Sequence, residues 1–273
     1  HFLPCFQHIA PSWVGADFTV ANLETTLGCD DFSGYPRFRS PWQIARDLRR
    51  AGMSALLLAN NHCCDQGEKG ICQTLHYLDS LRIPHTGIFR DTLSRPLYLR
   101  KGDFKIALLN YTYGTNGLPV PKGFVIPSLD TNRMLRDIAQ ARRDSATHIA
   151  AFLHWGDEYH TTPNNTQRHL ARWLHVHGVS LVIGSHPHVV QPVEYVTHDG
   201  DTTGITAYSL GNFISNQSRP GTDRGICLLI TLTYSAQGHT RHQAAIIPVL
   251  VRKTFENGQC QYHVIPSTPR PLS

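Results

Sequence analysis

The chain has 273 residues, 41% of them hydrophobic and 16% charged, which excludes a disordered protein and allows one sizeable core. No apolar stretch of about 18 residues is present, so the sequence predicts no membrane-spanning helix. The formal net charge is +5, but the basic residues are scattered and form no stripe with interleaved aromatic residues, which argues against nucleic-acid binding.

In chain order, the first part of the sequence alternates short apolar strands with amphipathic helices. The predicted strands are residues 18–21, 54–59, 84–88, 96–100, 104–111, 148–153 and 179–183. The predicted helices are residues 41–51, with Pro41 in the first turn, and residues 67–81, 130–143 and 167–177. Asp130 is the expected N-cap of the third helix.

The later part of the sequence reads almost entirely as strands joined by turns. These strands are predicted at residues 191–197, 204–209, 226–234, 242–251 and 261–265. No linker or repeat divides the chain. We therefore expect an α/β protein with one domain over residues 1–273. Its first half is βα-alternating and its second half is mostly antiparallel β, arranged as two packed sheets with helices outside.

The seven cysteines include no CxxC pair, which excludes a zinc ribbon and a thioredoxin-like motif and does not support a disulfide framework. The adjacent Cys63 and Cys64 are expected to be small buried residues packed under a turn.

Four of the predicted strands end in polar turns that carry possible metal ligands. One His-x-His motif alone is a weak signal, but ligand sites form where strands end in open α/β sheets, so four such turns indicate a site. The mixture of oxygen and nitrogen donors fits a catalytic metal site that holds water better than a closed structural zinc site. The candidate residues on these turns are Asn22, Glu24, Asn60, Asn61, His62, Asp65, His154, Glu158, His186 and His188.

The loop at residues 113–128 is long and rich in glycine and proline. A loop of this length is often functional, and it either forms a lid over the site or runs over the surface.

Several of these strings together resemble a known family. They are Ala21-Asn22-Leu23-Glu24, Leu58-Ala59-Asn60-Asn61-His62, His154-Trp155-Gly156-Asp157-Glu158-Tyr159, Gly184-Ser185-His186-Pro187-His188 and Ser209-Leu210-Gly211-Asn212-Phe213. Over residues 15–215 the chain resembles the CapA family of bacterial poly-γ-glutamate capsule synthesis proteins. That family is similar to the calcineurin-like metallophosphoesterases, so the resemblance implies a four-layer α/β/β/α sandwich.

The same resemblance implies a role for each candidate residue. His62 is the implied proton donor or oxyanion stabiliser, and Asn22, Asn60, Asp65, Glu158 and Asn212 are implied to bind substrate or support the ligands. The implied metal ligands are Glu24, Asn61, His154, His186 and His188. We expect them to share one pocket and to hold one or two ions of manganese, iron or zinc.

One departure from the metallophosphoesterase pattern concerns the first strand. Those enzymes open with a strand that carries Gly-Asp, whose aspartate binds metal, and nothing before Asn22 matches it. Either this strand precedes His1 in a longer chain, or one metal position has been lost. We expect any membrane contact to come from a segment outside these 273 residues.

The resemblance favours a metal-dependent hydrolase of phosphoesterase type that acts in capsule biosynthesis at the cell envelope, membrane-anchored or extracytoplasmic. Its expected substrate is an anionic polymer or a phosphoester, with other capsule synthesis subunits as possible partners. The alternative is a non-catalytic component of a capsule assembly or export complex that binds the anionic polymer. A nuclease of the same superfamily is disfavoured because the sequence shows no basic groove.

Overall fold

The computed structural model describes residues 2–90, 95–198, 200–234, 240–256 and 258–267. The fold is mixed α/β and divides into two compact units. The first unit contains residues 1–2, 16–154 and 177–179, and the second contains residues 3–15, 155–176 and 180–273. The prediction that all 273 residues form one domain stays a prediction.

The strands of the first unit end at or just before its predicted ligands. A parallel sheet has the order β1 (Val20–Asn22), β4 (Ala55–Leu57), β5 (His85–Thr86). The strands predicted at residues 96–100 and 104–111 are present as the antiparallel pair β6 (Leu97–Lys101) and β7 (Phe104–Thr112), and β7 pairs in parallel with β8 (His148–His154). All three residues of β4 and most of β8 are buried, as expected for continuous apolar strands.

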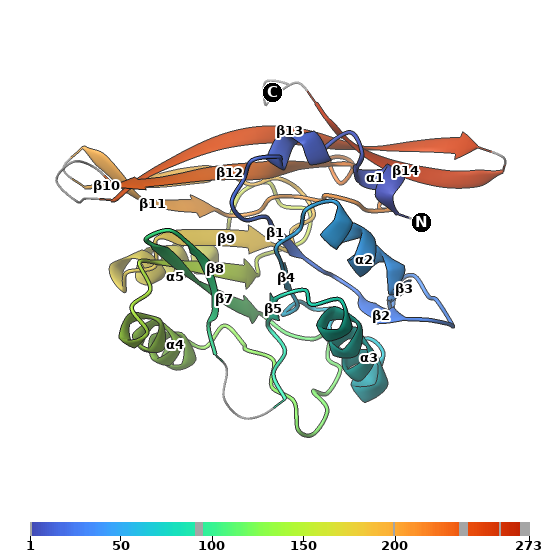
Figure 1. Ribbon diagram of the computed structural model, residues 1–273, viewed down its shortest axis with the longest axis horizontal. Helices are drawn as coiled ribbons and strands as arrows, with labels where there is room; N and C mark the ends of the chain where they lie inside the picture. Colours follow the sequence, from blue (N-terminus) through green and yellow to red (C-terminus); the bar gives the residue numbers. More distant parts are fainter. Residues whose placement is uncertain (1, 91–94, 199, 235–239, 257, 268–273) are drawn as a thin grey trace. The chain divides into compact units, whose positions relative to one another are not determined.

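Three helices accompany these strands, namely α2 (Gln43–Arg50), α3 (Gly67–Ser80) and α4 (Thr131–Arg143). Helix α3 buries the apolar side chains of Ile71, Leu75 and Leu78. Figure 1 shows this helix beside the short strand β2 (Thr26–Gly28), where the Thr74 hydroxyl accepts a hydrogen bond of 2.8 Å from the Leu27 amide.

The predicted start of helix α2 is wrong. Pro41 is not its first residue but the last residue of β3 (Arg39–Pro41), which pairs in parallel with β2. The next backbone amide, of Trp42, donates to the Gly28 carbonyl and so continues the strand contact. Strand pairing with a distant segment therefore delays the helix until Gln43.

Asp130 caps helix α4 as predicted, since its carboxylate accepts a hydrogen bond of 2.9 Å from the Asn132 amide. We expect Asp130→Ala to lower the free energy of unfolding by about 1 kcal/mol, because one backbone donor loses its partner. Urea denaturation followed by circular dichroism measures this loss. Asp130→Asn keeps an oxygen acceptor and should lose much less, and equal losses in both variants would contradict the capping role.

The second unit contains α1 (Leu3–Phe6), a 3-10 turn (Ala10–Trp13) and α5 (Asn165–Val176). Strand β9 (Leu181–Ser185) pairs in parallel with β11 (Asp201–Ala207), which pairs antiparallel with β10 (Val193–His198). The long strands β12 (Arg224–Tyr234), β13 (Thr240–Glu256) and β14 (Gln259–Pro266) form an antiparallel sheet, seen side by side in Figure 1. The mostly antiparallel character of this part is confirmed.

Two findings on the described residues concern membrane spans and cysteines. None of their helices combines the length and apolar character that a bilayer crossing requires. All seven cysteines carry free thiols, and Cys63 and Cys64 are buried, with 4% and 2% of their surface exposed.

Candidate functional site

In the second unit, the Gly184-Ser185-His186-Pro187-His188 segment forms the end of β9 and a sharp turn. A side chain at Gly184 would overlap the Tyr208 carbonyl oxygen and the Trp155 indole nitrogen, so only glycine fits there. His186 and His188 adopt positive φ angles of 101° and 61°. Non-glycine residues rarely adopt this backbone form, and its cost is tolerated mainly at functional sites.

This turn brings three possible ligands together. One ligand atom from each of Glu158, His186 and His188 lies within 4.8 Å of the other two. Sequence reasoning placed Glu158 among the supporting or substrate-binding residues, whereas its carboxylate lies where a ligand would. Its Oε1 is 3.9 Å from His188 Nε2.

Asn212 determines which ring nitrogen of His188 carries the proton. The Asn212 Nδ2 donates a hydrogen bond of 2.9 Å to the Thr222 carbonyl, so its Oδ1 is the atom that lies 3.0 Å from His188 Nδ1. An oxygen acceptor there requires the proton on Nδ1. The lone pair is then on Nε2, on the side of Glu158, as metal binding requires.

In the first unit, a second group of possible ligands lies at the carboxyl ends of β1, β4 and β8. His154 Nε2 is 2.8 Å from Asn61 Oδ1 and 3.7 Å from Glu24 Oε1. His154 and Asn61 are buried, with 1% and 2% exposure, and the Glu24 side chain is 25% exposed. The three predicted ligands of this unit are therefore neighbours.

Two asparagines hold the Glu24 turn in place. Asn22 donates a hydrogen bond of 3.0 Å to Glu24, and Asn60 donates one of 2.9 Å to the Leu23 carbonyl. The Asn60 oxygen in turn accepts from the His62 amide at 3.1 Å. Asn22 and Asn60 thus both hydrogen-bond within the Glu24 turn, and the roles that the resemblance implied for them stay predictions.

Each group of side chains fits a divalent metal ion by its donor chemistry. Ligand atoms about 2.0–2.2 Å from an ion lie roughly 3–4 Å from one another, and His154 Nε2 and Glu24 Oε1 have this spacing at 3.7 Å, whereas the 2.8 Å contact between His154 and Asn61 is a hydrogen bond. Imidazole with carboxylate or amide oxygen suits zinc, manganese or iron. The predicted ligands thus form one group in each unit, and their convergence in a single pocket stays a prediction.

His62 lies next to Asn61 but is held by a different partner. Its Nδ1 is 2.8 Å from Asp65 Oδ2, and the edge of its ring meets Phe38 at a centroid distance of 4.4 Å. The same Asp65 oxygen accepts a hydrogen bond from the Phe38 amide. Asp65 thereby fixes the orientation of the imidazole.

Two residues near the first group were missed by the sequence analysis, and both lie in the long loop at residues 113–128. The Tyr113 ring stacks on the His154 ring at 6.2 Å, and the Asn116 oxygen accepts hydrogen bonds from Asn61 Nδ2 and the Tyr113 hydroxyl. Asn116 thus turns the oxygen of Asn61 towards His154. The start of this loop contacts the candidate ligands, while a lid movement stays a prediction.

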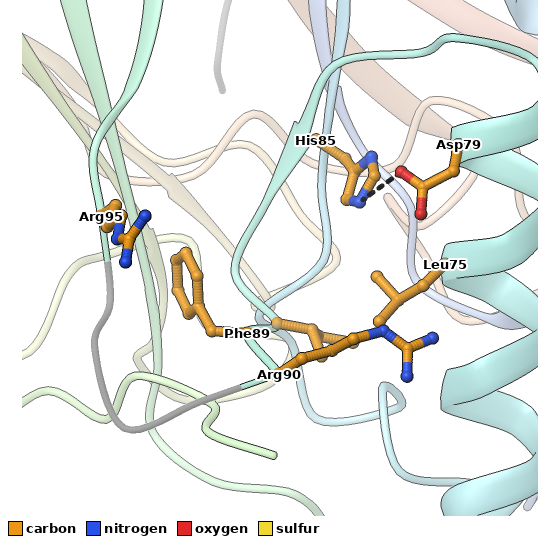
Figure 2. Close-up of a pocket in the computed structure, with 7 residues that line it drawn as sticks. Leu75, Asp79, His85, Phe89, Arg90 and Arg95 are labelled. Carbon is orange, nitrogen blue, oxygen red and sulfur yellow. Dashed lines mark ion pairs between the residues drawn. The ribbon is translucent and has the colours of Figure 1, made fainter. Parts of the chain in front are cut away.

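A separate pocket of about 290 Å³ lies between α3 and the segment around β5 in the first unit (Figure 2). It contains the ion pair between His85 and Asp79, with 3.8 Å between Nε2 and Oδ1. None of the side chains that line it is a predicted site residue.

Comparison with known proteins identifies relatives of the chain. A family model described as "Bacterial capsule synthesis protein PGA_cap" matches residues 1–217. "Capsule biosynthesis protein CapA" of Bacillus anthracis is 26% identical over 226 residues, which cover 78% of this chain and 54% of that protein. "PGA biosynthesis protein CapA" of Bacillus subtilis (strain 168) is 27% identical over 224 residues, or 78% of this chain and 57% of that one.

The chain thus spans about half the length of these curated relatives. A solved structure described as "Termus thermophilus Sulfate thiohydrolase SoxB in complex with glycerol" is similar with a TM-score of 0.47 and 15% identity. The match covers 75% of this chain and 34% of that one, and it is too weak to indicate shared chemistry.

Proposed function

Because this chain belongs to the bacterial capsule synthesis protein PGA_cap family, we propose that it acts in capsule biosynthesis at the cell envelope through a metal-dependent hydrolase site. The polymer we propose is poly-γ-glutamate, in line with the name of the Bacillus subtilis relative. The observation that carries the hydrolase part is the set of imidazole, carboxylate and amide groups at the strand ends.

We also propose the four-layer α/β/β/α sandwich for the fold.

The ligands we propose are Glu24, Asn61, His154, His186 and His188, with Glu158 added because its carboxylate lies beside the two histidines. A divalent ion bound there would supply a water of lowered pKa and neutralise negative charge that develops on the substrate. The protein's own contribution is to orient the ligand atoms: Asn212 fixes His188, and Asn116 fixes Asn61.

His62 is the proposed proton donor to the leaving group. Its Nδ1 is engaged by Asp65, so the proton to be transferred is carried on Nε2. The Asp65 carboxylate orients the ring, and the contact with Phe38 restricts its tilt. We propose that the substrate is an anionic polymer or a phosphoester.

The second candidate function is a non-catalytic component of a capsule assembly or export complex that binds the polymer. In this case the side-chain groups would bind the anionic polymer, and the chain itself would break no bond.

Metal content separates the two functions. We expect the full natural protein, purified without chelator, to contain manganese, iron or zinc by elemental analysis, and chelation to lower its melting temperature because the ion stabilises the folded state. Glu24→Gln should lower metal content and the hydrolysis of nitrophenyl phosphate esters. Glu68→Gln, at an exposed position in α3, is the matched control.

The control variant should keep both the metal and the activity. If the metal-supplemented natural protein binds no ion and hydrolyses no ester, the hydrolase proposal fails and the assembly component is favoured.

A further inference from the structure

Beside the histidine turn of the second unit, an arginine is held on an aromatic ring. The Arg219 guanidinium carbon lies 4.1 Å from the centroid of the Tyr159 ring, and that ring stacks on the His188 ring at 5.9 Å. Tyr159 itself is anchored to the turn, because its amide donates a 2.8 Å hydrogen bond to the Pro187 carbonyl. One aromatic ring therefore links the cation to a candidate metal ligand.

The backbone around Arg219 is tied to the same histidine from its other side. The Arg219 carbonyl accepts hydrogen bonds from the Thr222 hydroxyl and amide, at 2.6 Å and 3.1 Å. The Thr222 carbonyl accepts from Asn212, whose oxygen faces His188. Side chain and backbone thus form a closed ring of contacts that starts and ends at His188.

The Arg219 guanidinium has the properties of an anion-binding group. Within the ranges that the structure describes, no carboxylate pairs with it, and the residue is exposed. A guanidinium stacked on an aromatic ring still presents N–H donors at its edge, where carboxylate or phosphate oxygens bind with two hydrogen bonds. Stacking on Tyr159 also reduces the side-chain freedom that binding would otherwise remove.

We propose that Arg219 binds an anionic group of the substrate, a carboxylate or phosphate, next to the Glu158, His186 and His188 group, with Tyr159 as its platform. This inference rests on the proposed function and adds the residue that recognises the charge. Glu158 would repel such an anion in the absence of a cation. Binding should therefore be tighter when metal is present.

Isothermal titration calorimetry of the full natural protein tests the inference with two probes, a γ-linked glutamate tetramer and inorganic phosphate. Each probe is titrated into metal-loaded and chelator-treated protein. We expect Arg219→Gln to weaken binding of at least one probe roughly tenfold or more, because a charge-assisted contact is lost. Arg219→Lys should recover part of the affinity, since it keeps the charge but not the planar fork.

Three further variants complete the experiment, one as a control and two as tests of the Tyr159 platform. Arg241→Gln removes an exposed arginine that pairs with Asp201 at 2.7 Å and should leave binding unchanged. Tyr159→Leu removes the ring and should weaken binding, and Tyr159→Phe, which restores a ring, should recover most of the lost affinity. Elemental analysis should show the same metal content in Arg219→Gln and the wild type.

The outcomes separate this inference from the hydrolase proposal. Loss of tetramer binding alone identifies a polymer carboxylate as the ligand, and loss of phosphate binding alone identifies a phosphoester. If Arg219→Gln binds both probes as tightly as the wild type, or the wild type binds neither, the inference is overturned. A protein that binds no metal but loses anion affinity in Arg219→Gln retains the inference and loses the hydrolase.

Discussion

Replacing His188 by alanine is expected to remove most of the bound metal from this protein. Asn212 leaves the lone pair of His188 on Nε2, so this variant deletes a proposed ligand atom and not merely a nearby ring. Asn212→Ala should act more mildly, with roughly a 10–100-fold loss of metal affinity, because the ligand remains but is no longer oriented. Elemental analysis and metal titration of the purified variants measure both effects.

The matched control is His169→Ala, an exposed histidine on α5 of the same unit. It should retain full metal content and thermal stability. A His188→Ala protein that folds, by circular dichroism, and binds metal with wild-type affinity would remove His188 from the ligand set.

Replacing His62 by alanine should have the opposite signature, a normal metal content with a rate loss of about 10²–10⁴. The reason is that His62 is bound to Asp65 and is assigned to proton transfer. The loss should be large for an alkyl phosphoester and smaller for a nitrophenyl ester, because nitrophenolate leaves without needing a proton. Steady-state rates on both substrates with metal-saturated protein give the comparison.

His76→Ala, at an exposed position of α3, serves as the control and should leave both rates unchanged. Asp65→Asn should reduce the rate less than His62→Ala, since the imidazole remains. Equal metal loss in His62→Ala and His188→Ala would instead show that His62 is a ligand or a structural support.

Elements with strong local patterns could be predicted from the sequence, and elements made by distant pairing could not. Helix α3 was predicted within one residue at each end because its apolar residues repeat on one face. The four-residue helix α1 is too short to show any periodicity. Strand β13 runs to Glu256, beyond the predicted end at residue 251, because β14 pairs with it that far.

The residues of the candidate site also fall into those that could be predicted from the sequence and those that could not. The possible ligands were found because each follows a strand, a relation that is visible in the sequence. Tyr113, Asn116, Tyr159 and Arg219 were missed because their roles depend on contacts between loops, and no spacing encodes these contacts. Asn116 and Tyr159 both have positive φ angles, 51° and 66°, which become visible only in the folded chain.

The closed ring of contacts from His188 through Asn212, Thr222, Arg219 and Tyr159 has a thermodynamic consequence. If a cation at His188 and an anion at Arg219 share this ring, their binding free energies are coupled. Such coupling is reciprocal, so whatever factor the metal adds to anion affinity, the anion must add to metal affinity. The protein would then retain its ion most firmly while substrate is bound and release it more readily once the product has left.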